Sequence, residues 1–446
     1  MDKNNELLEN LKQAQYGTHI VIPLKGDYSN DLCNIEKDIK KSVFNKSLPE
    51  TFFESEPVSV NVLDNDLNEI TNKLFECEYN GRIAAKFAIN KRQFIEHCFR
   101  VEDCNFFVGT PSKTFDITKV ILYIFNTGVA FLVFHFKYLD ISTMRDIFNP
   151  SCVKLKNQNI LYYSEDGEAK IPICLKYCIQ KVLEGTNFSL FFPLNAERIF
   201  SDAYAVSVAV IPERIKDISD FKRIAYNLQR MQALEYDGFS EDSIHASLFT
   251  YPNQKNNSYQ WCSCVGDCSI SRVRCGDTLD RQIDDFRVNS MALIILALYQ
   301  KYSCLLFSER LRIDIRKGKR NFDSLENEMI DFKAFGKVDI SSVSRVANIR
   351  KFYQQVLEIN GVNEAVIEID EKLKVIAEHE REKGESKINA IMIILSLFSV
   401  VSILADMIAV IQSVSSGGKL EYSTVLFTIG GIVSIATIAV LFNRKR

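Results

Sequence analysis

The stretch 391–411 reads IMIILSLFSVVSILADMIAVI, and Asp406 is its only ionisable residue. Residues 424–442 read TVLFTIGGIVSIATIAVLF and carry no charge. At 1.5 Å per residue, a helix of either length spans about 30 Å, the thickness of the hydrocarbon core of a bilayer. We therefore predict two transmembrane helices at the C-terminal end of the chain.

The charges that flank these stretches predict their orientation. Residues 443–446 read NRKR, and the segment before the first span holds Arg381, Lys383 and Lys387. Basic flanking segments remain on the cytoplasmic side. We therefore expect a multi-pass protein of a bacterial inner membrane, with both termini in the cytoplasm and a short loop, 412–423, outside.

Polar residues of the first span follow one helix face, within an arc of about 140° at 100° per residue. They are Asn389, Ser396, Ser399, Ser402, Asp406 and Ser413. One interpretation is that the serines bond to the carbonyl four residues back and that the stripe holds neighbouring helices together. The other is a pore-lining face with a ring of carboxylates, which we favour because a charge inside a span is costly away from water. Two spans cannot enclose a pore, so this interpretation requires an oligomer.

The pattern ahead of the membrane predicts an α+β cytosolic, ligand-sensing domain over residues 1–285. β-Branched and aromatic runs predict strands, and two charged, periodic runs at 66–76 and 91–99 predict helices. The predicted strands are 18–24, 119–125, 128–136, 204–211, 246–251 and 259–265. The turn signal Asn126-Thr127-Gly128 predicts that 119–125 and 128–136 form a hairpin.

We predict a helical and stalk region over residues 286–386. A two-helix transmembrane pore domain is predicted over residues 387–446. The apolar run 291–298 meets Gln300 and Lys301 too soon for a span, which predicts a buried helix. The basic residues near 310–320 fit a solvated helix end, with a site for an anionic ligand or lipid headgroups as the alternative. A stripe at 3-4-3 spacing predicts a stalk helix shared between subunits. Its members are Val366, Ile369, Leu373 and Ile376.

The chain has 12 cysteines and no apolar N-terminal run that would indicate a signal peptide, which fits a reducing cytosol. Cys262, Cys264, Cys268 and Cys275 lie close together, but their spacing lacks paired zinc knuckles. We predict no metal site here; zinc is the alternative to two adjacent strands that turn at 265–267 and pack their cysteines inside.

The sequence indicates no enzyme. It contains none of the phosphate-binding, dinucleotide-binding, zinc-protease or serine-hydrolase motifs, so no catalytic residue is predicted. Five histidines lie far apart, and we expect them to be structural or exposed. A net charge of −3 disfavours direct nucleic-acid binding.

The order of these parts resembles the CorA-like divalent-cation transporters. The resemblance lies in the stretch 360–411, from NGVNEAVIEIDEK to the end of the first span, and in KVILYIFNTGVAFLVFHFKY at 119–138. It is closest to the divergent branch that includes proteins associated with type III CRISPR loci. The resemblance implies a funnel-shaped homopentamer, with a long stalk helix, whose cytosolic domains gate a pore.

For the CRISPR-associated branch, the resemblance further implies gating by a nucleotide second messenger, S-adenosylmethionine–AMP, and membrane disruption as an antiviral outcome. No residue of this chain matches a messenger-binding motif. The Gly-Met-Asn selectivity mouth of the transporters is also missing, since 411–418 reads IQSVSSGG. The alternatives are a divalent-cation transporter with a degenerate mouth and a membrane-tethered ligand sensor without a pore.

Overall fold

A computed structural model gives the fold in two units, Met1–Ile369 and Asp370–Arg446. It describes residues 3–26, 54–55, 74, 82–99, 105–107, 113–148, 160–163, 171–173, 175–184, 187–191, 203–252, 259–276, 290–316 and 323–415. The helix predicted at 66–76 and the second predicted span at 424–442 lie outside the described residues, apart from Leu74.

Three long strands form the centre of the sheet in the first unit: β1 (Gln15–Gly26), β5 (Thr114–Phe125) and β6 (Val129–Tyr138). β6 pairs antiparallel with both of the others. The predicted hairpin is confirmed, because β5 and β6 are joined by a tight turn. Gly128 has φ +86° in that turn, a conformation that glycine adopts without strain.

The remaining strands extend this centre into one mixed sheet of 13 described strands, in the order β11-β12-β13-β10-β1-β6-β5-β4-β7-β8. β10 and β13 pair in parallel and the other pairs are antiparallel. The remaining strands are β2 (Glu54–Ser55), β3 (Ala84–Asn90), β4 (Asn105–Phe107), β7 (Ile160–Tyr163), β8 (Ile171–Ile173), β9 (Phe188–Leu190), β10 (Tyr204–Ile211), β11 (Leu248–Thr250), β12 (Trp261–Val265) and β13 (Ser269–Cys275). The predicted α+β class is confirmed.

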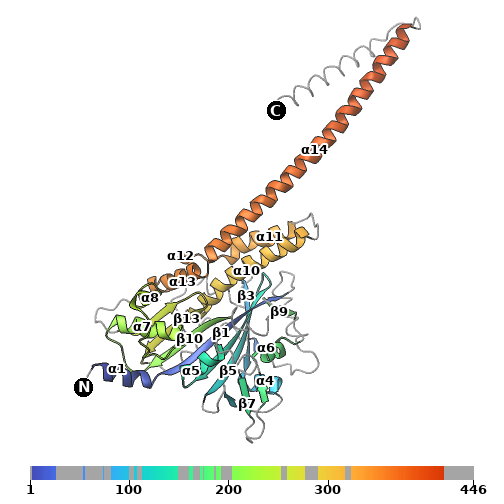
Figure 1. Cartoon of the computed structure of the whole chain (residues 1–446). Coiled ribbons are helices and arrows are strands. Elements are labelled where there is room, and N and C mark those ends of the chain that lie inside the picture. Colours follow the sequence, from blue (N-terminus) through green and yellow to red (C-terminus); the bar gives the residue numbers. More distant parts are fainter. Residues whose placement is uncertain are drawn as a thin grey trace. The chain divides into compact units, whose positions relative to one another are not determined.

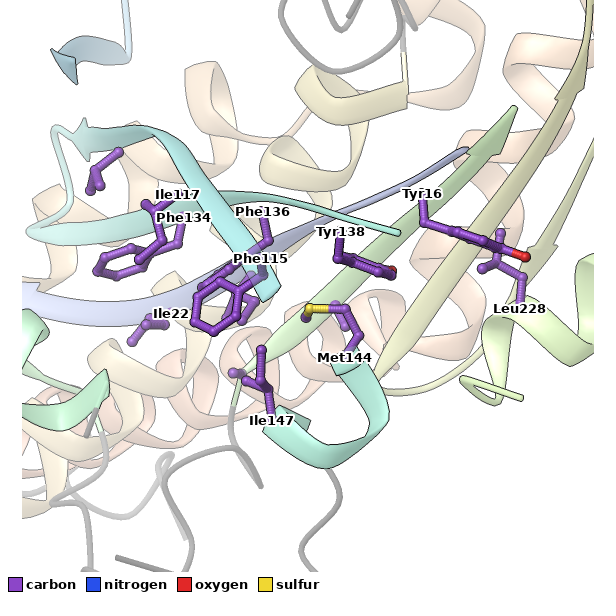
Figure 2. Close-up of a cluster of buried hydrophobic side chains, with 14 of the residues drawn as sticks. Tyr16, Ile22, Phe115, Ile117, Phe134, Phe136, Tyr138, Met144, Ile147 and Leu228 are labelled. Atoms are coloured by element: carbon purple, nitrogen blue, oxygen red, sulfur yellow. The ribbon is translucent and has the colours of Figure 1, made fainter. Parts of the chain in front are cut away.

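One face of the sheet carries an extensive apolar core (Figure 2). Phe134 and Phe136 of β6 point to this face and pack with Met144 of the helix that follows. Alternating residues of a strand point to opposite faces, which places the even-numbered residues of β6 together here. The helices that contribute to this core are α4 (Lys91–Phe99), α5 (Ile141–Phe148), α6 (Leu175–Leu183) and α7 (Ile218–Gln229). The short helices α1 (Lys3–Lys12) and α8 (Glu241–His245) also contribute, through Leu11 and Ile244.

Helix α10 (Ser290–Arg316) covers the opposite face (Figure 1). Its Tyr299 ring stacks on Phe125 with centroids 4.2 Å apart, and Ser303 Oγ lies 2.8 Å from Thr127 Oγ1. Among the described residues, one helical segment, Met291–Asp314, is long and apolar enough to cross a membrane. Within this segment, 78% of the most apolar stretch is buried inside the protein. This agrees with the buried helix predicted at 291–298.

The chain after α10 is helical, as predicted, but more interrupted. α11 (Asp323–Asp331) continues into a π-helical turn, Phe332–Gly336. Three helices then follow: α12 (Ile340–Val343), α13 (Ala347–Ile359) and α14 (Val362–Ser415), of which α14 contains the predicted stalk stripe. Gly361, with φ +60°, separates the last two, whereas Gly384 lies inside α14 without interrupting it.

Candidate functional site

Helix α14 changes character along its 54 residues. In the first unit Val362, Val366 and Ile369 are buried. In the second unit large apolar side chains are exposed over the segment predicted to be the first span. These side chains are Ile388, Ile391, Met392, Ile393, Ile394, Leu395, Val400, Met407, Ile408 and Ile411. An exposed apolar surface of this length fits a bilayer or other helices better than water.

The predicted pore-lining residues all lie on α14, which fixes their helical spacing. Asn389 is exposed and Ser396 is half-buried. Ser396 Oγ donates a hydrogen bond to the Met392 carbonyl at 2.6 Å, the bond four residues back that the helix-packing interpretation expects. The side chains of Ser399, Ser402, Asp406 and Ser413 lie outside the described residues, so the pore stripe stays a prediction.

The predicted stalk stripe is divided. Val366 and Ile369 are buried within the first unit, and Leu373 is half-buried. The exposed apolar side chains of this part of α14 are Ile367 and Val375, at 57% and 64% exposure. Val366 and Ile369 therefore serve the fold of their own unit. The side chain of Ile376 lies outside the described residues. Among the described side chains, Ile367 and Val375 are the apolar ones available for a contact with another chain.

The clustered cysteines lie on β12 and β13, which form the predicted hairpin. Cys262, Cys264 and Cys275 are buried, and burial raises the pKa of Cys264 to about 12 and that of Cys275 to about 11. Cys268 follows the turn and is exposed, so the prediction that all four pack inside is wrong for this residue. No group of three or more His, Cys, Asp or Glu side chains among the described residues could hold a metal ion.

On the other face of the same hairpin, an arginine lies between two aromatic rings. The guanidinium carbon of Arg272 is 4.8 Å from the centre of the Trp261 ring and 5.6 Å from that of Phe352, which belongs to α13. Arg272 Nε donates to Ser263 Oγ at 2.9 Å. Burial, with Arg274 nearby, lowers the pKa of Arg272 to about 9, so the group is still charged at neutral pH. We call Trp261, Arg272 and Phe352 the arginine clamp.

A second basic and aromatic group lies at the β11 edge of the sheet. The ammonium groups of Lys222 and Lys351 lie 5.3 and 5.8 Å from the centre of the Tyr251 ring. Lys222 belongs to α7 and Lys351 to α13, so helices of both faces reach this edge. Gln355 fixes α13 there, since it accepts from Thr250 Oγ1 at 2.6 Å and donates to the Phe249 carbonyl at 3.2 Å.

Together these residues place three cations and several aromatic faces at one end of the sheet. Such an arrangement binds anionic ligands with flat, aromatic parts, since arginine and lysine pair with phosphate and the rings stack on bases. The clamp is not among the sites that the sequence predicts. The available signal was the alternation in Ser269–Cys275, which places Arg272 and Arg274 on one face of a predicted strand.

Comparison with models of known protein families, with curated proteins and with solved structures finds no significant match to this chain.

Proposed function

We propose that the protein is an oligomeric channel of the CorA-like type in a bacterial inner membrane. The observation that supports this most directly is α14, one helix that begins among buried residues of the first unit and continues into a segment with exposed large apolar side chains. A continuous helix of this kind can transmit a change in the first unit to a membrane segment. The polar stripe that ends at Ser413 would then line the pore.

We further propose that the first unit receives the signal and that the signal is a nucleotide second messenger, with S-adenosylmethionine–AMP as the first compound to test. Support comes from the resemblance to CRISPR-associated CorA-like proteins and from the basic and aromatic end of the sheet. The biological outcome would be disruption of membrane integrity during antiviral defence. No enzymatic activity is needed for this function.

The test is ion flux from liposomes that contain the full-length protein, with and without S-adenosylmethionine–AMP. A channel releases ions only when the messenger is present. Asp406→Asn keeps the shape of the side chain and removes its charge, so cation flux should fall severalfold while assembly is unchanged. Met407→Leu, which changes an exposed apolar side chain outside the polar stripe, is the control, and it should conduct close to the parent level.

A membrane-tethered sensor without a pore is the second candidate. It is favoured by the Ser396–Met392 hydrogen bond, since a serine satisfied within its own helix is available for helix packing. A tether conducts nothing with or without the messenger. A divalent-cation transporter, the third alternative, conducts magnesium without any messenger.

A further inference from the structure

The arginine clamp leaves most of the donors of its guanidinium uncommitted. Arg272 carries five N–H groups, of which the Nε group is bonded to Ser263. Among the described residues, neither Nη group has an acceptor and no carboxylate forms an ion pair with Arg272. Arg272 is half-buried, so it is not sealed inside the core. A half-buried cation without a counter-ion among the described residues is a place for an anion.

The rings of the clamp hold the guanidinium plane in position. Trp261 comes from β12 and Phe352, which is 2% exposed, from α13. Contact with two rings reduces the freedom that an arginine would lose on binding, and a preorganised guanidinium binds phosphate in a defined direction. Tyr251 and Trp261 are both half-buried, which leaves aromatic surface at the same end of the sheet. The site therefore offers both partners that a nucleotide needs, a fixed cation and a half-buried aromatic ring.

The clamp is also built from the element that leads to α14. Phe352 and Gln355 both belong to α13, and α13 ends at Ile359, just before Gly361 and α14. Gly361 N donates to the Glu358 carbonyl at 3.0 Å and the Gly361 carbonyl accepts from Ala365 N at 3.0 Å, so the junction is hydrogen-bonded on both sides. A ligand that enters between β12 and α13 must act on α13 and, through this junction, on the first turns of α14.

We propose that the arginine clamp is the ligand site of the first unit, where Arg272 binds the phosphate of a nucleotide and an aromatic ring beside it stacks on the base. Binding shifts α13 relative to the sheet and so biases α14. This inference rests on the proposed function for its ligand class and for its consequence at the membrane.

The chain contains one tryptophan, Trp261, so its fluorescence reports on the clamp alone. The experiment titrates the full-length protein in detergent with AMP, adenosine or inorganic phosphate, at constant ionic strength. AMP should change the emission of Trp261 saturably. Adenosine lacks the charge and phosphate lacks the ring, so each should bind at least about tenfold more weakly than AMP. A phosphate response equal to that of AMP would indicate an anion site with no base recognition and would overturn the nucleotide assignment.

Arg272→Gln should weaken AMP binding about tenfold or more, and Arg272→Lys should weaken it less, because the charge remains but the planar fork is lost. Arg345→Gln, which removes an exposed arginine outside the site, is the matched control and should bind as the parent does. If Arg272→Gln fails to fold, the AMP affinity of Arg272→Lys and of Phe352→Leu is measured in its place. Equal AMP affinity by calorimetry in the parent and in a folded Arg272 variant would overturn the proposal, as would the absence of any saturable response to millimolar AMP.

The liposome experiment separates this proposal from the proposed channel. A protein that binds AMP through Arg272 and conducts no ions would disprove the channel and leave the site in place. A messenger-gated channel whose AMP affinity is insensitive to Arg272 would leave the channel in place and disprove the site.

Discussion

His19 of β1 and His135 of β6 lie opposite each other in the register, with ring centroids 4.2 Å apart. Both are buried, and burial lowers the pKa of His19 to about 3 and that of His135 well below its ordinary value. Both rings are therefore neutral in the folded protein at neutral pH, whereas in the unfolded chain they take up protons near pH 6.5. Below this pH, the folded protein therefore binds fewer protons than the unfolded chain. The stability that the two neutral rings allow is present above pH 6.5 and is lost as the pH falls.

We predict that the free energy of unfolding falls between pH 7.5 and pH 5. The contribution of His19 to this fall is about 2 kcal/mol, since one group contributes about 1.36 kcal/mol per pH unit below pH 6.5. Denaturant unfolding of the full-length protein, followed by Trp261 fluorescence, measures the change. His245→Asn is the control, because it removes an exposed histidine outside the buried pair. Constant stability over this range would show that the two rings become charged inside the fold.

At the scale of the element, Gly361 directly precedes the long helix α14 and Gly384 lies within it. The structure separates them, since Gly361 has φ +60° between α13 and α14 and Gly384 is helical. Gly361→Ala should lower the free energy of unfolding by about 1–2 kcal/mol, because a Cβ is strained in the left-handed region. Gly384→Ala should stabilise α14 by about 1 kcal/mol, the helix propensity that alanine gains over glycine. Urea unfolding followed by circular dichroism should show shifts of opposite sign; two shifts of the same sign would contradict the assigned break.

The sequence predicts the elements that depend on neighbouring residues, but not the contacts between distant elements. The β5–β6 hairpin and the buried helix α10 depend on neighbouring residues, and both were predicted correctly. The arginine clamp depends on the register that places Arg272 beside Ser263 and on the packing of α13, which is about 80 residues farther along the chain. β10 and β13 also pair in parallel across about 60 residues. Strand patterns specify which face a residue takes but not which distant element covers that face, so the clamp could not be predicted.

At the scale of the whole molecule, the proposed pore requires several copies of the chain, and the resemblance to CorA-like proteins implies five. Within the first unit, Val366 is 6% exposed and contributes to the fold of its own chain, whereas Val375, at 64% exposure in the second unit, is open to a neighbouring chain. The two valines lie nine residues apart on α14, which at 100° per residue places them on opposite faces of the helix, one buried and one exposed. They distinguish a helix that is stabilised by its own unit from one that is shared between subunits.

We predict that the mass of the full-length protein in detergent corresponds to about five subunits, by analogy with the family it resembles. Val375→Glu should lower the subunit number, because it places a charge in an apolar contact between chains. Val366→Ala should lower the free energy of unfolding by about 2 kcal/mol and leave the mass unchanged, because it opens a cavity inside one chain. Light scattering gives the mass and denaturant unfolding the stability. A parent protein that is monomeric at every concentration would exclude the pore, since the two spans of a single chain cannot surround a path for ions.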